Sequence, residues 1–296
     1  MASLAARAVK AYARRVIKKV PRDPEHLVQH LRRALNNSPL PNWLPRGVRR
    51  TQFAVEGVRG EWLRVNNPTQ VILYLHGGGY IAGVPTTYLT LCAKFAKALQ
   101  ADVYMPAYRL APEHPFPAAL DDAMTVYRLL LKKYPANKIT VMGDSAGGGL
   151  TLGTTLALRD AGLPLPKCNL AYSPMADLTA PHGSRNLNEL RDDMFTPEMY
   201  HIGIDLYGRT EADRLNPHAS PVFGDFTGMP PLLVTVDRSE CMHDDSVKVV
   251  ERARAAGVDV TFIERDGLLH VWPIFYPLLP EARQDVAESV MFIDRH

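Results

Sequence analysis

The pentapeptide Gly143-Asp144-Ser145-Ala146-Gly147 constrains the fold more than any other part of the sequence. An apolar segment, residues 139–142, precedes it, and a helical pattern follows to about residue 161. A serine in the pattern G-x-S-x-G between a strand and a helix lies on a sharp turn, where glycines are needed because a Cβ atom would clash. Such a turn exposes the Ser145 hydroxyl at the carboxyl edge of a parallel sheet, and the helix N-terminus behind it favours negative charge. We therefore predict a nucleophilic serine on an α/β scaffold.

The rest of the chain agrees with this scaffold, because strand-like and helix-like segments alternate from residue 51 onward. Alternation of this kind predicts a mostly parallel central sheet with helices on both faces. Strands are expected over 52–55, 62–65, 70–75, 102–106, 139–142, 169–173, 232–236 and 258–263. Helices are expected over 88–99, 118–134, 145–161, 244–256 and 281–293. Residues 51–296 are therefore interpreted as one catalytic domain.

Residues 175–226 interrupt this alternation. They are polar, rich in Pro and Gly, and contain one amphipathic helical pattern over 197–207. An insertion of this length inside a compact domain is usually functional. We interpret it as part of a cap over the site.

Residues 1–50 form a basic N-terminal arm, with 12 Lys or Arg and 2 acidic residues, on a body whose net charge is −7. Apolar residues recur there at helical spacing, with the cations mostly between them. A helix covering the mouth of the active site is the favoured interpretation; a helix lying on an anionic membrane surface and an organelle transit peptide are the alternatives. No nucleic-acid-binding motif accompanies the charge. The apolar stripe consists of Leu4, Ala8, Tyr12, Val16 and Val20.

The composition is that of an ordinary globular protein, with 46% hydrophobic and 22% charged residues. No apolar run approaches the roughly 20 residues that cross a bilayer, and the N-terminus lacks the apolar core of a secretory signal. The three cysteines are scattered and odd in number, which favours a reducing compartment over a disulfide framework. A cytoplasmic location is expected.

A second motif, His76-Gly77-Gly78-Gly79-Tyr80, directly follows the apolar segment 70–75. Consecutive glycines expose backbone N–H groups that can converge on an oxyanion. We expect the amides of Gly78 and Gly79, with Gly77 as an alternative, to act together with the amide of Ala146. His76 is expected to shape the loop by hydrogen bonding. The run lacks the Lys-Ser/Thr of a phosphate-binding P-loop and the spacing of a dinucleotide fingerprint.

The two motifs together resemble those of the hormone-sensitive-lipase-like family of bacterial esterases, which have the α/β-hydrolase fold. The segments YRLAPEHPFPA at 108–118, HVWP at 270–273 and LPEA at 279–282 strengthen this resemblance, which covers roughly residues 70–296. It implies a carboxylic-ester hydrolase with a helical cap that acts on short- to medium-chain esters. It also implies that no metal and no organic cofactor takes part, and that the protein forms a homodimer through an exposed edge strand.

His270 is the predicted general base. It lies in a loop after the last expected strand, at the sheet edge where Ser145 emerges, and an imidazole there can take the serine proton and return it to a leaving alcohol. In this fold the triad follows the chain order Ser, acid, His.

The acid of the triad is less strictly determined by the sequence. Aligning Met242-His243-Asp244 with the L-x-D of the family's D-P-L-x-D segment places Glu240 at the acid position, where an aspartate is commoner. Asp237 is the first alternative, and Asp244 or Asp245 the next, although these two can also cap a helix. Asp144 is expected to anchor the nucleophile turn.

Three other kinds of protein are alternatives to an esterase. A small-molecule-binding protein on this fold would typically have lost the serine or the histidine, and both are present here. An amidase or a lactonase would use the same triad. A lipase acting at a lipid surface would use the basic arm as its anchor.

Overall fold

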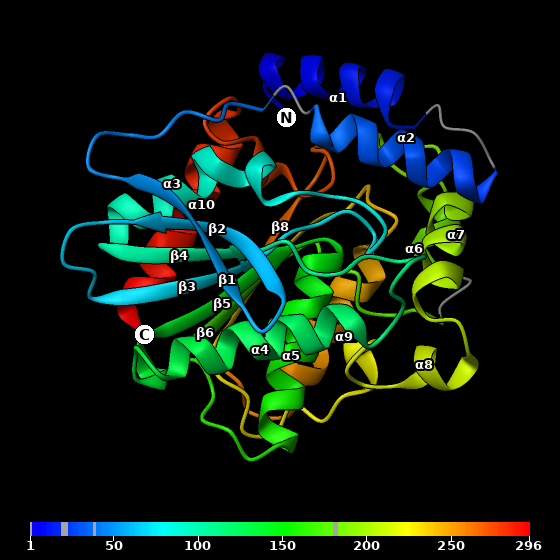
Figure 1. Ribbon diagram of the computed structural model, residues 1–296. Helices are drawn as coiled ribbons and strands as arrows, with labels where there is room; N and C mark the ends of the chain where they lie inside the picture. Colours follow the sequence, from blue (N-terminus) through cyan, green and yellow to red (C-terminus); the bar gives the residue numbers. More distant parts are fainter. Residues whose placement is uncertain (1, 19–22, 38–39, 180–182) are drawn as a thin grey trace.

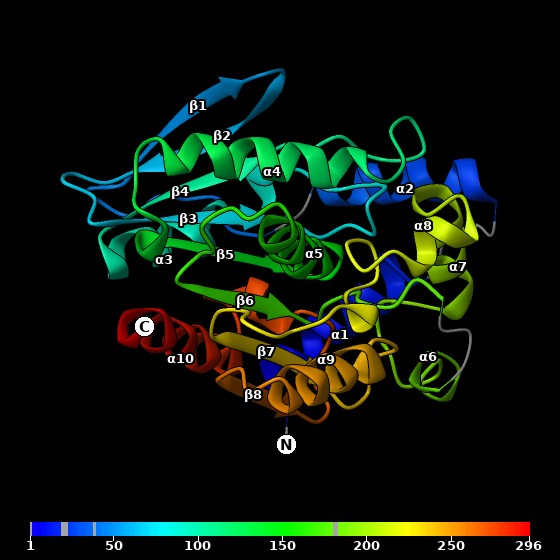
Figure 2. The same ribbon diagram turned by 90° about the horizontal axis from the view of Figure 1, so that it is seen from below.

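The computed structural model describes residues 2–18, 23–37, 40–179 and 183–296. Eight strands form one sheet in the order β1-β2-β4-β3-β5-β6-β7-β8, which can be followed from one edge to the other in Figure 2. β1 pairs with β2, and β2 with β4, in antiparallel fashion, whereas all pairs from β4 to β8 are parallel. The strands are β1 (Arg49–Val55), β2 (Val58–Arg64), β3 (Gln70–Leu75), β4 (Ala101–Pro106), β5 (Ile139–Asp144), β6 (Cys168–Tyr172), β7 (Leu232–Asp237) and β8 (Val260–Arg265).

Helices cover both faces of the sheet, which explains why β3 is apolar from Val71 to Leu75. Its odd-numbered residues, such as Val71 and Leu73, pack in one core with α4 and α5, whereas Ile72 and Tyr74 pack in a second core with α3 and α10. Successive side chains of a strand point to opposite faces, so a strand buried on both sides needs apolar residues at every position. The helices are α3 (Leu89–Leu99), α4 (Ala118–Leu131), α5 (Ala146–Asp160), α9 (His243–Ala255) and α10 (Pro280–Arg295). The α/β architecture predicted from the sequence is confirmed.

The predicted elements are present, with ends that differ by at most four residues. The helix α7 (Pro197–Tyr207) has the expected bounds, whereas α4 ends at Leu131 instead of residue 134. Two short helices, α6 (Ser184–Leu187) and α8 (Glu211–Leu215), flank α7 within the 175–226 segment. Short 3₁₀ turns are η1 (Pro85–Tyr88), η2 (Ala136–Lys138), η3 (Pro221–Phe223) and η4 (Trp272–Phe275).

The N-terminal arm contains two helices instead of the one that we expected. Ser3 caps the N-terminus of α1 (Leu4–Val16), and its hydroxyl accepts the amide N–H of Ala6. Val20, the last residue of the predicted apolar stripe, lies outside the described residues. Asp23 caps the N-terminus of α2 (Pro24–Asn36), and its carboxylate accepts the amide N–H of His26. An Asp N-cap followed by Pro at the first helical position is a start signal that could have predicted α2.

The face of α1 that packs against the protein is not the predicted apolar stripe. Leu4 is 82% exposed and Tyr12 is 47% exposed, whereas Ala6 and Ala13 are buried against the segment around Trp272. Small side chains let the helix axis approach the domain closely, and the larger apolar residues then remain at its outer side. Within the described ranges, no helix is both long enough and apolar enough to cross a bilayer.

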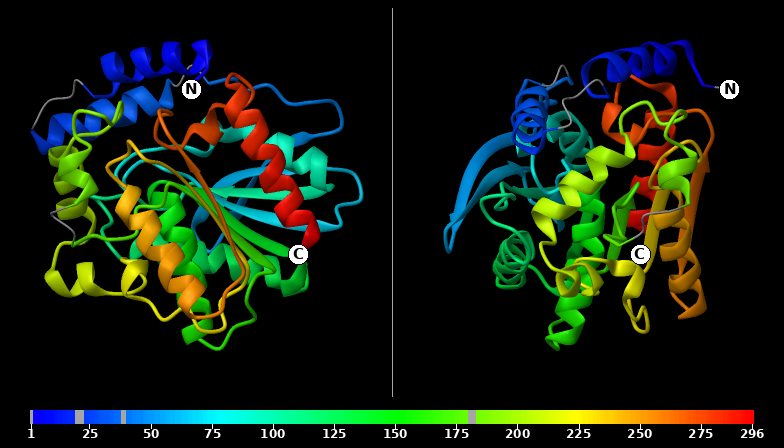
Figure 3. Two further views of the ribbon diagram at one scale, coloured as in Figure 1. Left: turned by 180° about the vertical axis from the view of Figure 1, so that it is seen from behind. Right: turned by 90° about the vertical axis from the view of Figure 1, so that its right-hand side faces the viewer.

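The arm and the 175–226 segment lie at the same end of the molecule. α1 and α2 lie together across this end, and α7 lies beside the end of α2, as the views in Figures 1 and 3 show. The loops that follow β3, β5 and β7 line a cavity beneath these helices. The sheet therefore presents its carboxyl-end loops to a space that is covered by helices from two distant parts of the chain.

Candidate active site

Ser145 lies on a strained turn between β5 and α5. Its φ is +55° and its ψ is −123°, a conformation that costs a non-glycine residue about 1–3 kcal/mol. A Cβ atom at Gly143 would lie 2.4 Å from the Leu75 carbonyl oxygen, and one at Gly147 would lie 2.0 Å from the same oxygen. The Ser145 amide donates to the Tyr172 carbonyl at 2.7 Å. The surrounding backbone therefore holds the turn, and the side chain lines the cavity.

His270 and Glu240 form a buried pair beside this cavity. Nδ1 of His270 lies 2.5 Å from Oε2 of Glu240, and both side chains are 1% exposed. Burial disfavours the imidazolium, but the Glu240 carboxylate outweighs this effect and raises the pKa of His270. Nε2 of His270 is buried without a hydrogen-bond partner among the described residues. The ring thus has one nitrogen bound to a carboxylate, and the other is available for a proton from a substrate or a nucleophile.

The second oxygen of Glu240 is also held. Oε1 accepts the Ser173 hydroxyl at 2.8 Å and the Asp237 amide at 2.8 Å, so the carboxylate has a single orientation toward His270. These two donors come from the ends of β6 and β7. The sequence did not indicate a role for Ser173, because nothing in its surroundings resembles a motif.

The three alternative acids have other partners. The Asp237 carboxylate accepts the Ser239 amide and hydroxyl and the amides of Gly267 and Leu268, so it shapes the loop that leads to His270. Asp244 accepts the Ser184 amide at the start of α9. Asp245 is buried and pairs with Arg185 at 3.0 Å. Of the four candidates, Glu240 is the one that the structure brings to His270.

The glycine run lies opposite the serine. The Gly77 amide already donates to Oδ1 of Asp144 at 3.0 Å and to the Tyr88 hydroxyl at 3.1 Å. Gly78 and Gly79 have φ values of +126° and +62° and line the cavity together with Ser145. A Cβ atom at Gly78 would lie 2.1 Å from the Ala82 carbonyl oxygen, which excludes any side chain there.

Asp144 anchors this region. Its carboxylate accepts the hydroxyls of Tyr74 at 2.9 Å and Tyr88 at 3.1 Å in addition to the Gly77 amide. Burial raises the pKa of the Asp144 carboxyl to about 6, against the effect of these hydrogen bonds. The residue before the nucleophile is therefore joined to the glycine loop, as expected for an anchor of the turn.

His76 lies inside the loop and not at the cavity. Its ring stacks on Tyr108 at 4.2 Å, and Nδ1 lies 2.8 Å from the Gly77 carbonyl oxygen. Burial lowers the pKa of His76 to about 4, so the ring is neutral at pH 7. The structure places this histidine where it can shape the loop.

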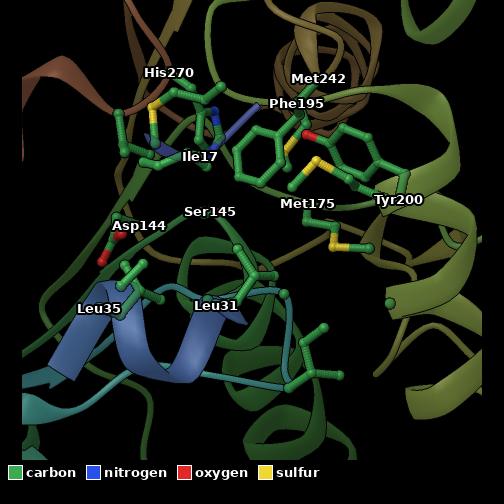
Figure 4. Close-up of a pocket in the computed structure, with 18 of the residues that line it drawn as sticks. Ile17, Leu31, Leu35, Asp144, Ser145, Met175, Phe195, Tyr200, Met242 and His270 are labelled. Atoms are coloured by element: carbon green, nitrogen blue, oxygen red, sulfur yellow. The ribbon is translucent and has the colours of Figure 1, made fainter. Parts of the chain in front are cut away.

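The cavity is lined mainly by apolar side chains from the arm and from the 175–226 segment. In Figure 4 Leu31 and Leu35 of α2 lie on one side, and Phe195 and Tyr200 lie on the other, with Ser145 and Met175 between them. The Phe195 ring meets the His270 ring edge to face at 4.9 Å. Two other buried aromatic residues nearby have structural contacts instead: Tyr80 stacks on Tyr207, and Trp272 donates to Asp285.

The cations of α1 face the 175–226 segment. Lys10 pairs with the buried Asp193 at 3.0 Å, and Arg14 pairs with the same carboxylate. Lys18 donates to the carbonyls of Glu189 and Asp192. These contacts hold the arm against the loop that carries Phe195.

No group of three or more metal-ligating side chains occurs in the part of the chain that the structure describes. His243, which precedes two aspartates, has its Nε2 at 2.9 Å from Oε1 of Glu264. Cys241 is fully buried, and burial raises the pKa of its thiol, which keeps it protonated.

Comparison with known proteins identifies the family of this chain. A family model of the α/β hydrolase fold matches residues 72–274. An acetyl-hydrolase of Streptomyces hygroscopicus is 40% identical over 79% of this chain and 78% of its own length, and an esterase of Acinetobacter venetianus is 34% identical over 80% and 78%.

Solved structures agree over nearly the whole chain. An esterase from the bacterial hormone-sensitive lipase family has a TM-score of 0.89 at 34% identity and covers 100% of this chain and 99% of its own. EstE5 soaked with p-nitrophenyl butyrate has a TM-score of 0.89 at 35% identity, with coverages of 99% and 98%. The chain therefore belongs to the α/β-hydrolase fold family and, within it, to the bacterial esterases of the hormone-sensitive lipase family, as its motifs predicted.

Proposed function

We propose that this esterase cleaves short- to medium-chain carboxylic esters by acyl transfer, with Ser145 as nucleophile, His270 as general base and Glu240 as the acid that orients it. The main support for this proposal is the contact of 2.5 Å between Oε2 of Glu240 and Nδ1 of His270. It leaves Nε2 of the imidazole without a partner among the described residues, in a cavity that Ser145 also lines.

Each residue has a defined step. Nε2 of His270 takes the proton of the Ser145 hydroxyl while Oγ bonds to the ester carbonyl carbon. His270 then gives the proton to the leaving alkoxide oxygen, and the carbon–oxygen bond breaks to leave an acyl-serine. In the second half His270 activates water, which releases the acid and restores the serine. Glu240 stays ionised and stabilises the imidazolium in both halves.

The oxyanion that forms at the carbonyl would be held by the amides of Gly78, Gly79 and Ala146. Ala146 is the first residue of α5, so its N–H has no acceptor within the helix. Gly77, the alternative donor, is left out of this proposal because its N–H already has acceptors in Asp144 and Tyr88. Loss of one such donor typically costs about 3 kcal/mol in the barrier.

We also propose that residues 1–50 and 175–226 act together as the cap. The contacts of Lys10, Arg14 and Lys18 with the 189–193 loop support this assignment, because they bind these three cations of the arm to the 175–226 segment. Binding of the arm to an anionic membrane and homodimerisation through an edge strand stay predictions. Vesicle co-sedimentation and analytical ultracentrifugation would test them.

The function is tested by hydrolysis of p-nitrophenyl esters from acetate to palmitate. We expect short and medium chains to be cleaved, and Ser145→Ala to lose on the order of 10⁶ in kcat, as removal of a triad serine does elsewhere. Ser246→Ala is the matched control, since Ser246 is also buried and its hydroxyl donates to the Met242 carbonyl, one turn earlier in the chain. A Ser145→Ala protein that retains wild-type turnover would exclude the mechanism.

A further inference from the structure

A second apolar space lies next to the catalytic cavity, between α1, α2 and the chain around η4. We call it the outer groove. Its volume is about 310 Å³, compared with about 80 Å³ for the cavity at Ser145. Ala8, Val9, Tyr12 and Val16 of α1 line one side of it, and Phe275 and Leu278 line another. Among the described residues, no acidic or basic side chain lines it.

The outer groove and the catalytic cavity have a common wall, because six side chains line both spaces. The one polar atom among these side chains is the Tyr88 hydroxyl, which is already bonded to Asp144 and to the Gly77 amide. Apart from this hydroxyl, the side chains between the two spaces are hydrocarbon or thioether groups. The six residues are Ile17, Ala34, Leu35, Tyr88, Met194 and Ile274.

The position of the charges on α1 supports a ligand without charge. None of the four cations of α1 lines the groove, and two of them, Lys10 and Arg14, are bound by Asp193. At the outer end of the groove Tyr12 and Leu278 are 47% and 46% exposed. Burial of an open apolar groove by a ligand is favourable, because apolar surface is removed from water. Such grooves commonly mark binding sites.

We propose that the outer groove binds the far end of a hydrocarbon chain of the ester whose carbonyl lies at Ser145. This inference rests on the proposed function and extends it, because it makes the enzyme selective for chains longer than the inner cavity holds. The two spaces lie side by side along six shared side chains, which favours this occupant over a protein segment, since a hydrocarbon chain is narrow enough to pass between side chains. Each methylene buried in the groove increases kcat/KM about fourfold.

The test compares two alanines of α1. Ala8 lines the outer groove, whereas Ala11 lies on the other flank of the helix, beside Arg7 and Lys10. Both are exposed, so a tryptophan at either position leaves the core intact. In Ala8→Trp the indole fills the groove, and in Ala11→Trp it lies outside the groove, beside Arg7 and Lys10. Val16→Phe, which fills the same groove from the end of α1, is a second blocking variant.

The measurement is the ratio of kcat/KM for a long ester to that for an acetate. p-Nitrophenyl acetate and decanoate lengthen the acyl side, and ethyl and decyl acetate lengthen the alcohol side. We expect Ala8→Trp and Val16→Phe to lower the ratio at least tenfold in one of the two series, and Ala11→Trp to leave it unchanged.

Unchanged ratios in both series for both blocking variants would overturn the inference. Ser145→Ala, assayed in parallel on p-nitrophenyl acetate, separates this outcome from a failure of the catalytic proposal. If Ser145→Ala is inactive while the ratios do not change, the triad stands and the groove does not bind substrate. If Ser145→Ala remains active, the proposed function fails first.

Discussion

Replacing Glu240 by glutamine tests the geometry of the site most directly, because the change keeps the shape and removes only the charge and two lone pairs. In the native site Oε1 accepts two donors, the Ser173 hydroxyl and the Asp237 amide, while Oε2 accepts Nδ1–H of His270. A glutamine has one oxygen, and two donors require it on the side of Ser173. Its NH₂ group must then face His270.

The imidazole responds by changing its tautomer. Nδ1 becomes the acceptor of the glutamine N–H, so the proton of the neutral ring moves to Nε2, which faces the cavity. A protonated Nε2 cannot take the Ser145 proton. In another serine hydrolase the equivalent exchange of an acid for its amide lowers kcat by about 10⁴. We expect a loss of that order here, which corresponds to about 5 kcal/mol in the barrier.

The assay is steady-state hydrolysis of p-nitrophenyl butyrate at pH 7, with circular dichroism to show that the fold is retained. Glu264→Gln is the matched control, because Glu264 also contacts a histidine, His243 at 2.9 Å, but away from the cavity. It should keep wild-type turnover. Glu240→Asp keeps the charge and displaces it by one methylene, so it should lose about 10²-fold. A Glu240→Gln protein within tenfold of wild type would refute the tautomer argument and direct attention to another acid.

Three further predictions follow from the same structure. Because the Glu240 carboxylate raises the pKa of His270 and the neutral ring is the active form, kcat/KM should fall as the pH drops through a value above 6.5, and in Glu240→Ala this inflection should move to lower pH; a pH–rate profile checks both. Gly147→Ala places a Cβ atom 2.0 Å from the Leu75 carbonyl oxygen and should destabilise the fold by about 4 kcal/mol in urea unfolding, whereas Gly203→Ala, inside α7 with its nearest atom at 3.5 Å, should leave the stability unchanged or raise it by up to about 1 kcal/mol. Asp193→Asn weakens the pairs with Lys10 and Arg14, so hydrogen exchange of the α1 amides should become about tenfold faster while that of β5 is unchanged; equal rates in α1 would show that its alanine face alone holds it.

The central scaffold could be predicted because its signals are local. β3 is apolar at all positions after Gln70, and the nucleophile turn needs glycines on both sides; each of these features is visible within a few residues of sequence. His270 follows from its place after the last strand.

Other parts of the site depend on contacts between distant segments. Ser173 meets Glu240 only because β6 and β7 are neighbours in the sheet, and Tyr88 reaches Asp144 across the glycine loop. The face of α1 was predicted wrongly for the same reason. Helical periodicity indicates a stripe of large apolar residues, but the surface beneath the helix selects the small ones, Ala6 and Ala13.

The contacts of α1 also affect the order in which the molecule is completed. Ser3 donates to Glu281, and Lys10 donates to the Gly267 carbonyl, three residues before His270. A ribosome makes these N-terminal residues first, yet the partners that they need are among the last to emerge. α1 therefore lacks these partners through most of synthesis. Nascent chains that stop before residue 267 would therefore lack part of the surface against which α1 packs.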